Sequence, residues 1–368
     1  MHIQLKPALR RLWRDSSSVQ IGLSMHRGTV LEGLTSDDAR LLEELREGVD
    51  PEETHGRGRE LIDLLLEAGV AAPRGEGPAL LSKDGEGAGR WAPDAAVWSV
   101  VHGGNGNGWD VLAGRRAAHV AIRGAGRLGT TLAATLAGCG VGHVSVADDR
   151  HVMAADLAPA GAQARDLGRP RVEVAVEVIG RSGGRAGPPP PGPGTSSRPD
   201  VGVLVDHGAA DAVRADSLLS ADVPHLSIVV RDDDVVVGPF VRPGHGPCLR
   251  CLDRHRGDRD PLWPSMLAQV LGPAPGTLEA EETAVATLAA GLAALQVLAH
   301  LDGVSAPAAQ GATLEVELPD GLVSRRSWPA HPRCGCHWPP SPERTSDDGP
   351  PQHAAGGRAG AAVPGGRQ

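Results

Sequence analysis

The sequence contains no tyrosine and only one phenylalanine, Phe240, among its 368 residues. Aromatic rings therefore contribute little to the core, which we expect to consist of leucine, valine and alanine with seven tryptophans as the large rings. Glycine and proline are abundant instead, at 50 and 31 residues. The chain has room for two domains, because a domain usually takes about 100–200 residues.

An excess of positive charge is also lacking, since 36 lysines and arginines stand against 45 acidic residues, a net charge of −9. Nucleic acid binding needs a concentrated cationic surface that displaces counterions, so we exclude nucleic acid as a partner. The chain lacks an apolar run of about 18 residues, and residues 1–15 lack the apolar stretch of a signal peptide. We therefore expect a cytoplasmic protein that does not enter a membrane. In that reducing compartment, the five cysteines indicate metal binding or catalysis rather than disulfides.

Residues 1–72 form the first predicted domain. Apolar and polar residues alternate from Val19 to Leu31, which predicts a β-hairpin. Two short helices follow, one with Ser36 as its N-cap and one from about Arg59 to Ala68. A hairpin with two helices is typical of a winged-helix-like α+β module. Residues 73–108, which begin with a stretch rich in glycine and proline, are expected to be a linker.

The second predicted domain covers residues 109–338, where strands and helices alternate as in an α/β, Rossmann-like fold with a mostly parallel sheet. Proline lacks a backbone donor, so the proline-rich stretch 181–199 is predicted to be a disordered insertion. Residues 339–368 are predicted to be a disordered tail from their composition. We expect strands at 119–123, 143–147, 201–206, 226–230, 234–241, 313–318 and 322–326, and helices at 127–138, 169–180, 211–220 and 281–301.

A glycine-rich turn, Gly124-Ala125-Gly126-Arg127-Leu128-Gly129, lies directly after the first of these strands and opens a helix. In such a turn the first glycine permits the tight bend, the second lets backbone approach phosphate, and the third lets the helix pack on the strand. Free N–H groups at the helix start then bind an anion. Asp148 and Asp149 end the next strand, at the spacing of an acid that binds ribose hydroxyls. The turn predicts a nucleotide-binding pocket. NAD and FAD are the first ligands that this pattern suggests, but no catalytic His/Asp pair later in the sequence indicates hydride chemistry.

Four cysteines form two close pairs, Cys248 with Cys251 and Cys334 with Cys336. Two such pairs complete a tetrahedral shell of thiolates around one ion, which leaves no open position. We therefore predict a structural zinc site. The alternative shell exchanges one cysteine for His255 or His337.

The glycine turn, the acidic strand end and the cysteine pairs together resemble the ThiF/MoeB/HesA family, bacterial relatives of the ubiquitin-activating enzymes. The resemblance covers residues 109–338, with close similarity at 124–149 and weaker similarity at 166–179 and 244–251. It implies an adenylating fold that uses ATP and magnesium on a protein's C-terminal carboxylate, usually as a homodimer. It assigns Gly124, Gly126 and Gly129 to the phosphate turn and Asp148 or Asp149 to the ribose.

Other family positions have changed. The phosphate-binding Asn-x-x-Arg-Gln segment corresponds here to residues 156–160, which begin with Asp156 and hold no arginine. The family lysine corresponds to Arg171, and the magnesium-binding aspartate falls near Ala209 or Ala210, with Asp206 and Asp211 nearby. Because such chemistry depends on stabilising charge at the transferring phosphate, we expect ATP turnover to be largely lost.

A winged-helix-like module before a degraded ThiF-like domain resembles the leader-peptide-binding proteins of azoline-forming peptide biosynthesis. That resemblance implies a precursor peptide added as a β-strand, for which Val19–Leu23 could supply the edge, and a partner enzyme such as a cyclodehydratase. One alternative is an active adenylyltransferase for a ubiquitin-like or sulfur-carrier protein. In that case Arg127, Arg165, Arg169 or Arg171 would replace the missing cations, with Arg127 and Arg171 as the candidate catalytic residues. A structural dimer with a vestigial pocket is a third possibility.

Overall fold

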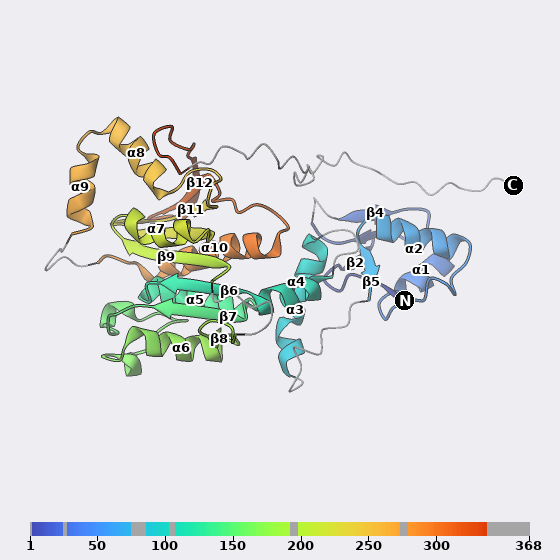
Figure 1. The fold of residues 1–368 in the computed structure, drawn as a ribbon. Helices are drawn as coiled ribbons and strands as arrows, with labels where there is room; N and C mark the ends of the chain where they lie inside the picture. Colours follow the sequence, from blue (N-terminus) through green and yellow to red (C-terminus); the bar gives the residue numbers. More distant parts are fainter. Residues whose placement is uncertain are drawn as a thin grey trace. The chain divides into compact units, whose positions relative to one another are not determined.

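The computed structural model describes residues 2–24, 28–74, 86–102, 107–191, 198–272 and 279–336. The chain forms two compact units, of which the first contains Met1–Ala113 and the second Gly114–Asp347. Figure 1 shows the elements of each unit coloured along the sequence. Each unit has its own apolar core, built from residues of that unit alone.

The first unit contains a three-stranded antiparallel sheet and two helices that bury one face of it. Strands β2 (Arg11–Trp13), β3 (Val19–Ile21) and β4 (Thr29–Leu31) pair in that order. Helices α1 (Ser36–Glu44) and α2 (Arg57–Glu67) cover the buried face, and β1 (Ile3–Leu5) pairs with β5 (Ala71–Pro73). This arrangement confirms the expected winged-helix-like α+β module.

Two details of this unit differ from the prediction. The N-cap of α1 is Thr35 rather than Ser36, because the Thr35 side chain accepts from the Asp38 N–H while the Asp38 carboxylate accepts from the Thr35 N–H. The stretch from Val19 does not supply a sheet edge, because β3 is the central strand, paired on both sides. The open edges belong to β2 and β4.

The segment predicted to be a linker, residues 73–108, contains helix α3 (Glu86–Val101) and ends at the first residue of helix α4 (Gly108–Ala117). Trp91 and Ala95 of α3 pack with Leu112 of α4 in a small apolar cluster. Glycine and proline lower the helix propensity of this segment, but burial of a tryptophan offsets that cost, as tertiary contacts often do. Residues 75–85 and 103–106 lie outside the described residues.

The second unit is built on an eight-stranded sheet in the order β13-β12-β11-β10-β9-β6-β7-β8. Five neighbouring strands, β10, β9, β6, β7 and β8, are parallel, and the other three extend the sheet antiparallel. The bounds are β6 (His119–Arg123), β7 (His143–Ala147), β8 (Arg185–Ala186), β9 (Val201–His207), β10 (His225–Val230), β11 (Asp234–Val241), β12 (Ala312–Glu317) and β13 (Leu322–Ser327). This architecture confirms the α/β, Rossmann-like class.

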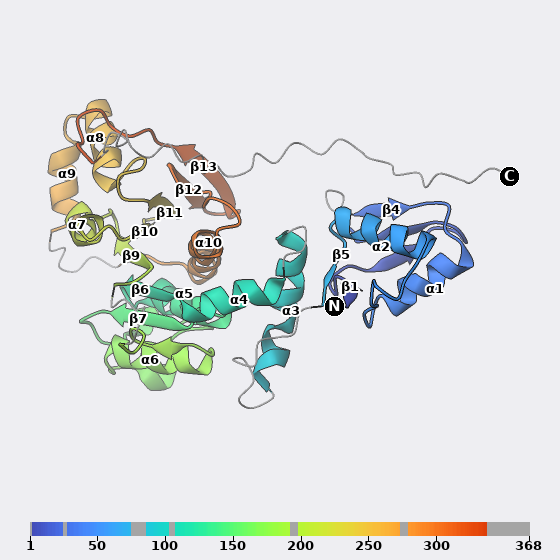
Figure 2. The ribbon, with the colours of Figure 1, turned by 45° about the vertical axis from the view of Figure 1, so that its right-hand side comes forward.

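Helices cover both faces of this sheet. Helices α5 (Arg127–Gly138) and α10 (Thr283–Asp302) pack side by side on one face, where they bury Val203 and Val205 of β9 (Figure 2). Leu204 points to the opposite face, where α7 (Ala212–Ser220) and α8 (Leu249–Arg259) cover it. Helix α6 (Arg171–Arg181) packs against α5 and β7. β9 is therefore buried on both sides, which accounts for its continuous apolar run.

Several features of this unit were not expected from the sequence. Helices α8 and α9 (Trp263–Val270) were not predicted. The insertion at 181–199 contributes the two-residue edge strand β8, and its residues 192–197 lie outside the described residues, as does the predicted tail. Among the described helices, only α10 is long and apolar enough to cross a membrane, but half of its apolar stretch is buried against the sheet and α5, as expected of a core helix.

Candidate functional site

The glycine turn joins β6 to α5, and its geometry explains why glycine occupies its first and last positions. Gly124 has φ +102°, a conformation that side chains disfavour. A Cβ atom at Gly129 would lie 1.9 Å from the Gly124 carbonyl oxygen, so any side chain there would push the helix off the strand. The predicted strand–turn–helix context is therefore present. Whether the turn binds nucleotide stays a prediction.

Asp148, the predicted ribose acid, contacts the turn itself. It accepts a hydrogen bond from the Ala125 N–H at 2.7 Å and another from the Arg150 N–H at 2.9 Å, and it lies 3.3 Å from the Arg171 guanidinium. Burial pushes its pKa up, but these two N–H donors and the Arg171 charge outweigh burial and hold the pKa below its usual value. Both oxygens of Asp148 thus have internal partners. Asp149 is exposed beside it and lines the neighbouring pocket.

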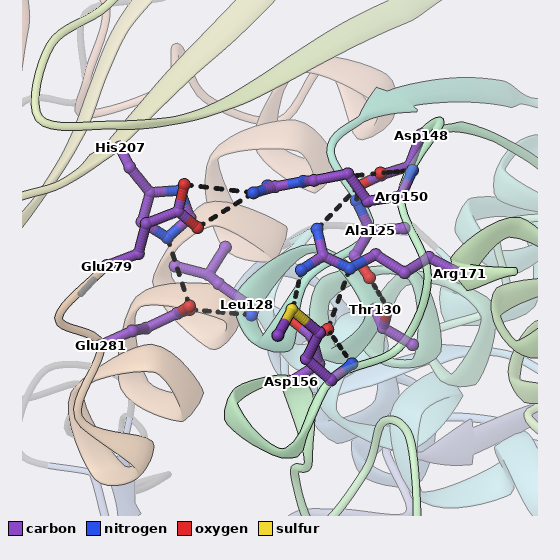
Figure 3. Close-up of polar contacts among 11 residues, drawn as sticks. Ala125, Leu128, Thr130, Asp148, Arg150, Asp156, Arg171, His207, Glu279 and Glu281 are labelled. Carbon is purple, nitrogen blue, oxygen red and sulfur yellow. Dashed lines mark hydrogen bonds and ion pairs between the residues drawn. The ribbon is translucent and has the colours of Figure 1, made fainter. Parts of the chain in front are cut away.

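Arg171, which occupies the position of the family lysine, is bound by an internal carboxylate. Asp156 accepts two hydrogen bonds from its guanidinium, at 2.6 and 3.0 Å, in a bidentate pair (Figure 3). Both side chains are buried, with 5% of Arg171 and 8% of Asp156 exposed. The negative charge of Asp156 is therefore neutralised by Arg171. Arg171 is thus held by the carboxylates of Asp156 and Asp148 and does not face an open site.

The N-terminus of α5, where a nucleotide phosphate would bind, contacts Glu281. The Leu128 N–H donates to one Glu281 carboxylate oxygen at 2.9 Å, and His207 lies 3.4 Å from the other (Figure 3). Arg127 donates to the Glu281 backbone carbonyl oxygen. Only 10% of the Glu281 side chain is exposed. A helix N-terminus attracts anions. The Glu281 carboxylate therefore occupies a position where a phosphate could otherwise bind.

A pocket of about 810 Å³ opens beside the turn at the carboxyl ends of the parallel strands, where open α/β sheets bind their ligands. Its lining carries five carboxylates and three guanidinium groups, from Asp148, Asp149, Asp206, Asp211 and Glu279 and from Arg123, Arg150 and Arg214. Arg150 binds Glu279 at 3.0 Å and Arg214 binds Asp206 at 3.1 Å. The excess of carboxylates makes the lining unfavourable for a triphosphate.

The predicted magnesium position fits a metal poorly. Ala209 lines the pocket with no ligand atom, and Asp211 caps α7 by accepting from the Val213 N–H. Asp206 is buried, which raises its pKa, and it pairs with Arg214. Within the ranges that the structure describes, no three carboxylate or histidine ligands converge here.

The remaining candidate cations also have internal partners. Arg169 binds Glu177 at 2.5 Å and Asp166 at 3.0 Å, and the exposed Arg165 lies 4.0 Å from Asp166. The guanidinium of Arg127 points to the backbone before α10.

The four cysteines converge on one point. Their sulfur atoms all lie within 4.8 Å of one another, with Cys248 3.5 Å from Cys334 and Cys251 3.3 Å from Cys336. Four thiolates on a tetrahedral zinc lie about 3.8 Å apart, so this spacing fits a metal closely. Burial raises the pKa of Cys248 and raises that of Cys336 to about 11, so a bound cation is needed to hold these sulfurs as thiolates.

Histidine is not part of this cluster among the described residues. The His255 ring bonds to the Pro329 carbonyl oxygen, which leaves the four-cysteine shell as the one that the geometry supports. His337, the other alternative ligand, lies outside the described residues. The ring of His245, close in sequence to the first cysteine pair, bonds to the Pro243 carbonyl oxygen.

Sequence reasoning missed the roles of Glu281, Glu279 and Arg150. Acidic residues before a helix are ordinary in sequence, and Glu282 does cap α10 by accepting from the Val285 N–H. Nothing local indicates that the residue before this cap reaches another helix 153 positions earlier in the chain. The contact becomes visible only once α5 and α10 are packed together.

Comparison with known proteins agrees with this architecture. The model of the ThiF family matches residues 109–182, which confirms the resemblance from the glycine turn through α6. No curated protein sequence matches the chain.

Solved structures share the fold, and three of them serve as examples. The microcin C7 biosynthetic enzyme MccB in complex with N-formylated MccA has a TM-score of 0.65 at 15% identity, covering 91% of this chain and 99% of that one. E. coli MccB with ATP has a TM-score of 0.64 at 15% identity, covering 92% and 100%. PaaA has a TM-score of 0.56 at 17% identity, covering 73% and 91%. The chain therefore has an MccB-like fold over nearly its whole length.

Proposed function

We propose that this protein binds a ribosomally made precursor or leader peptide and has lost efficient adenylation. The loss of adenylation is supported above all by the Glu281 carboxylate, which lies at the N-terminus of α5, 2.9 Å from the Leu128 N–H. A phosphate approaching the turn would have to displace this carboxylate and would meet its negative charge.

The pairing of Arg171 supports the same conclusion. Catalysis of phosphoryl and nucleotidyl transfer depends on cations that face the charge developing on phosphate. Here the guanidinium is bound by Asp156 at 2.6 Å and lies 3.3 Å from Asp148. Its charge is already compensated before any ligand binds. Each lost cation or metal ligand costs about 2–4 kcal/mol of transition-state stabilisation.

The proposed binding of a precursor peptide is supported by the structure of the first unit and by the fold of the whole chain. MccB has been crystallised with MccA peptides, and this chain shares the MccB fold through both of its units. We extend to this chain the binding of a precursor peptide, and we propose that a partner enzyme such as a cyclodehydratase performs the ATP chemistry. An exposed sheet edge in the first unit supports strand addition of that peptide.

We assign zinc to the cysteine cluster, with Cys248, Cys251, Cys334 and Cys336 as its ligands. Four sulfurs close the coordination shell, so the metal supplies structural stability and no chemistry. Reduced thiolates at this site agree with our proposal that the protein is cytoplasmic.

Two measurements on the full chain test the proposal. ATP–pyrophosphate exchange, with and without the precursor peptides encoded beside the gene, should stay at background. Fluorescence anisotropy should detect binding of one of those labelled peptides. ATP–pyrophosphate exchange that rises when a peptide is added would contradict the loss of adenylation. Failure of every such peptide to bind would contradict the proposed binding of a precursor peptide.

One observation favours a second function, the active adenylyltransferase. The 810 Å³ pocket remains open at the carboxyl ends of the strands, with the exposed side chains of Arg123 and Asp149 facing it. Exchange of ATP and pyrophosphate that depends on a ubiquitin-like or sulfur-carrier protein would establish this function in place of the first.

A further inference from the structure

A cavity of about 240 Å³ lies between α8 and the sheet face that α7 and α8 cover. Its lining has one residue, Ala209, in common with the larger pocket beside the glycine turn. Pockets for drug-sized ligands begin at about 300 Å³. This cavity therefore has room for a molecule the size of one amino acid, and a nucleotide is too large for it.

One wall of the cavity is aliphatic. Val229 of β10 and Val236 of β11 line it from the sheet, and Leu249 and Leu252 line it from α8. All four side chains are buried, with at most 7% of any of them exposed. A polar group placed against this aliphatic wall would lose its hydration without gaining a partner, which is costly. The wall therefore favours an apolar part of a ligand.

The cavity is also lined by an acid and a cation that lie next to each other on α8. Arg256 Nη1 donates to Asp253 Oδ1 at 3.3 Å, and the Trp263 indole N–H donates to the same oxygen at 3.3 Å. Over the described ranges of the chain, the Arg256 guanidinium makes no other hydrogen bond, and Asp253 Oδ2 makes none. Most of the N–H donors of Arg256 and one oxygen of Asp253 thus remain for a ligand.

Two tryptophans hold the Arg256 guanidinium in place. Its central carbon lies 5.1 Å from the centre of the Trp263 ring and 5.7 Å from that of Trp328. Cation–π contacts of this kind fix a guanidinium without using its N–H donors. Only 27% of the Arg256 side chain and 17% of the Asp253 side chain are exposed. A ligand would therefore meet an acid and a cation that are already positioned and largely shielded from water.

The third charged residue of the lining, Arg231, is not available in the same way. Its guanidinium binds both carboxylate oxygens of Asp234, with Nε 2.6 Å from one of them. Such a bidentate pair compensates the arginine internally. The charges that remain for a ligand are one positive and one negative, from Arg256 and Asp253.

We infer that this cavity binds a free α-amino acid with an aliphatic side chain. The carboxylate of the ligand accepts from Arg256, its ammonium group donates to Asp253, and its side chain packs on the aliphatic wall. Both charges are required next to each other, and a free amino acid has them on one carbon atom. The last residue of a peptide lacks the ammonium group, and the first residue lacks the carboxylate. This site lies in the second unit and does not depend on the proposed binding of a precursor peptide.

Isothermal titration calorimetry of the full-length protein with single amino acids tests the inference. Leucine, isoleucine, valine or methionine should bind, whereas glutamate and lysine should not, because their extra charge would face the aliphatic wall. N-acetyl-leucine represents the last residue of a peptide, and leucinamide represents the first. Each should bind at least about tenfold more weakly than leucine, because each leaves one buried charge without its partner.

Two variants assign the charges of the ligand to the two residues. Arg256→Gln should weaken leucine binding about tenfold and change leucinamide binding by less than about twofold, since leucinamide has no carboxylate. Asp253→Asn should weaken leucine binding by a similar factor and leave the binding of N-acetyl-leucine unchanged. Arg254→Gln and Asp232→Asn are the matched controls, because both residues are exposed and lie outside the lining, and they should bind leucine as the wild type does.

Circular dichroism and metal analysis check that each variant keeps its fold and its metal, because Asp253 follows Cys251 closely in the chain. If a variant does not fold, the three leucine compounds still test the site on the wild type. Absence of binding by every amino acid would overturn the inference. Equal affinity for leucine, N-acetyl-leucine and leucinamide would overturn it as well. Neither result would bear on the proposed binding of a precursor peptide, which anisotropy measures separately.

Discussion

At the scale of single residues, Glu281 and Arg171 show how the protein's own side chains can occupy the phosphate-binding groups around a glycine turn. The carboxylate occupies the helix N-terminus, and the guanidinium is bound by Asp156 and Asp148. The first contact occupies an N–H group that a phosphate would need, and the second compensates the charge of a cation. The two changes act together, because one fills the anion site and the other neutralises the cation beside it.

We expect Glu281→Ala to raise the affinity for ATP about tenfold, because it frees the N–H groups at the start of α5 and removes a negative charge. Isothermal titration calorimetry of the wild type and the variant measures this. Glu173→Ala, an exposed position on α6, controls for the change in net charge and should bind ATP as the wild type does. Equal affinities for all three proteins would mean that Glu281 does not compete with phosphate.

Asp148 links stability to pH. Its folded pKa lies below its ordinary value, so its carboxylate stabilises the fold at pH values above the unfolded pKa of about 3.9, and this contribution is lost as the pH falls through the folded pKa. The difference in unfolding free energy between wild type and Asp148→Asn should therefore be largest near neutral pH and shrink below about pH 4. Urea denaturation across pH measures it, with Asp149→Asn as the control for a removed charge. A difference that grows in acid would contradict this assignment.

At the scale of elements, the cysteine cluster explains a helix that the sequence did not predict. Helix α8 is polar along most of its length, and Leu249, Cys251 and Leu252 are its buried residues. Cys248 is its N-cap, so the two pairs of sulfurs tie its first turn to the segment after β13. A bound metal would supply the stability that the short apolar face does not.

Metal analysis tests this directly. We expect about one zinc per wild-type chain and loss of that zinc in Cys251→Ser, with a lower melting temperature. Cys139→Ser is the matched control, because Cys139 caps α5 away from the cluster, and it should keep its zinc. Full zinc content in Cys251→Ser would contradict a four-cysteine shell.

At the scale of the whole molecule, we expect a homodimer. Leu288 of α10 lies against the turn before β13, and Leu318, Leu322 and Val323 are exposed at the same edge of the large sheet. Leu322 is 66% exposed, and burying such side chains against a second copy gains about 25 cal/mol per Å².

Sedimentation velocity of the wild type should therefore give a dimer, and Leu322→Lys should shift it to the monomer, because a lysine in an apolar interface is costly to desolvate. Leu262→Lys, equally exposed on the segment before α9, should leave the assembly unchanged. A monomeric wild type would refute the expectation.

The sequence by itself determined the sheet, the glycine turn and the cysteine pairs. A strand buried on both faces is recognisable from an apolar stretch such as the first five residues of Val201–His207. The turn needs glycine where backbone approaches backbone. The two cysteine pairs were recognisable because ligand spacing within each pair is local.

Only the tertiary structure decided what surrounds these features. Packing of α5 beside α10 brings Glu281 to the helix start, and folding of residues 152–171 brings Asp156 to Arg171. The pairing of β3 on both sides moved the open edge to β2, which alternation within one strand could not reveal. Such contacts depend on where distant segments meet in space, and periodicity and local propensity carry no information about that.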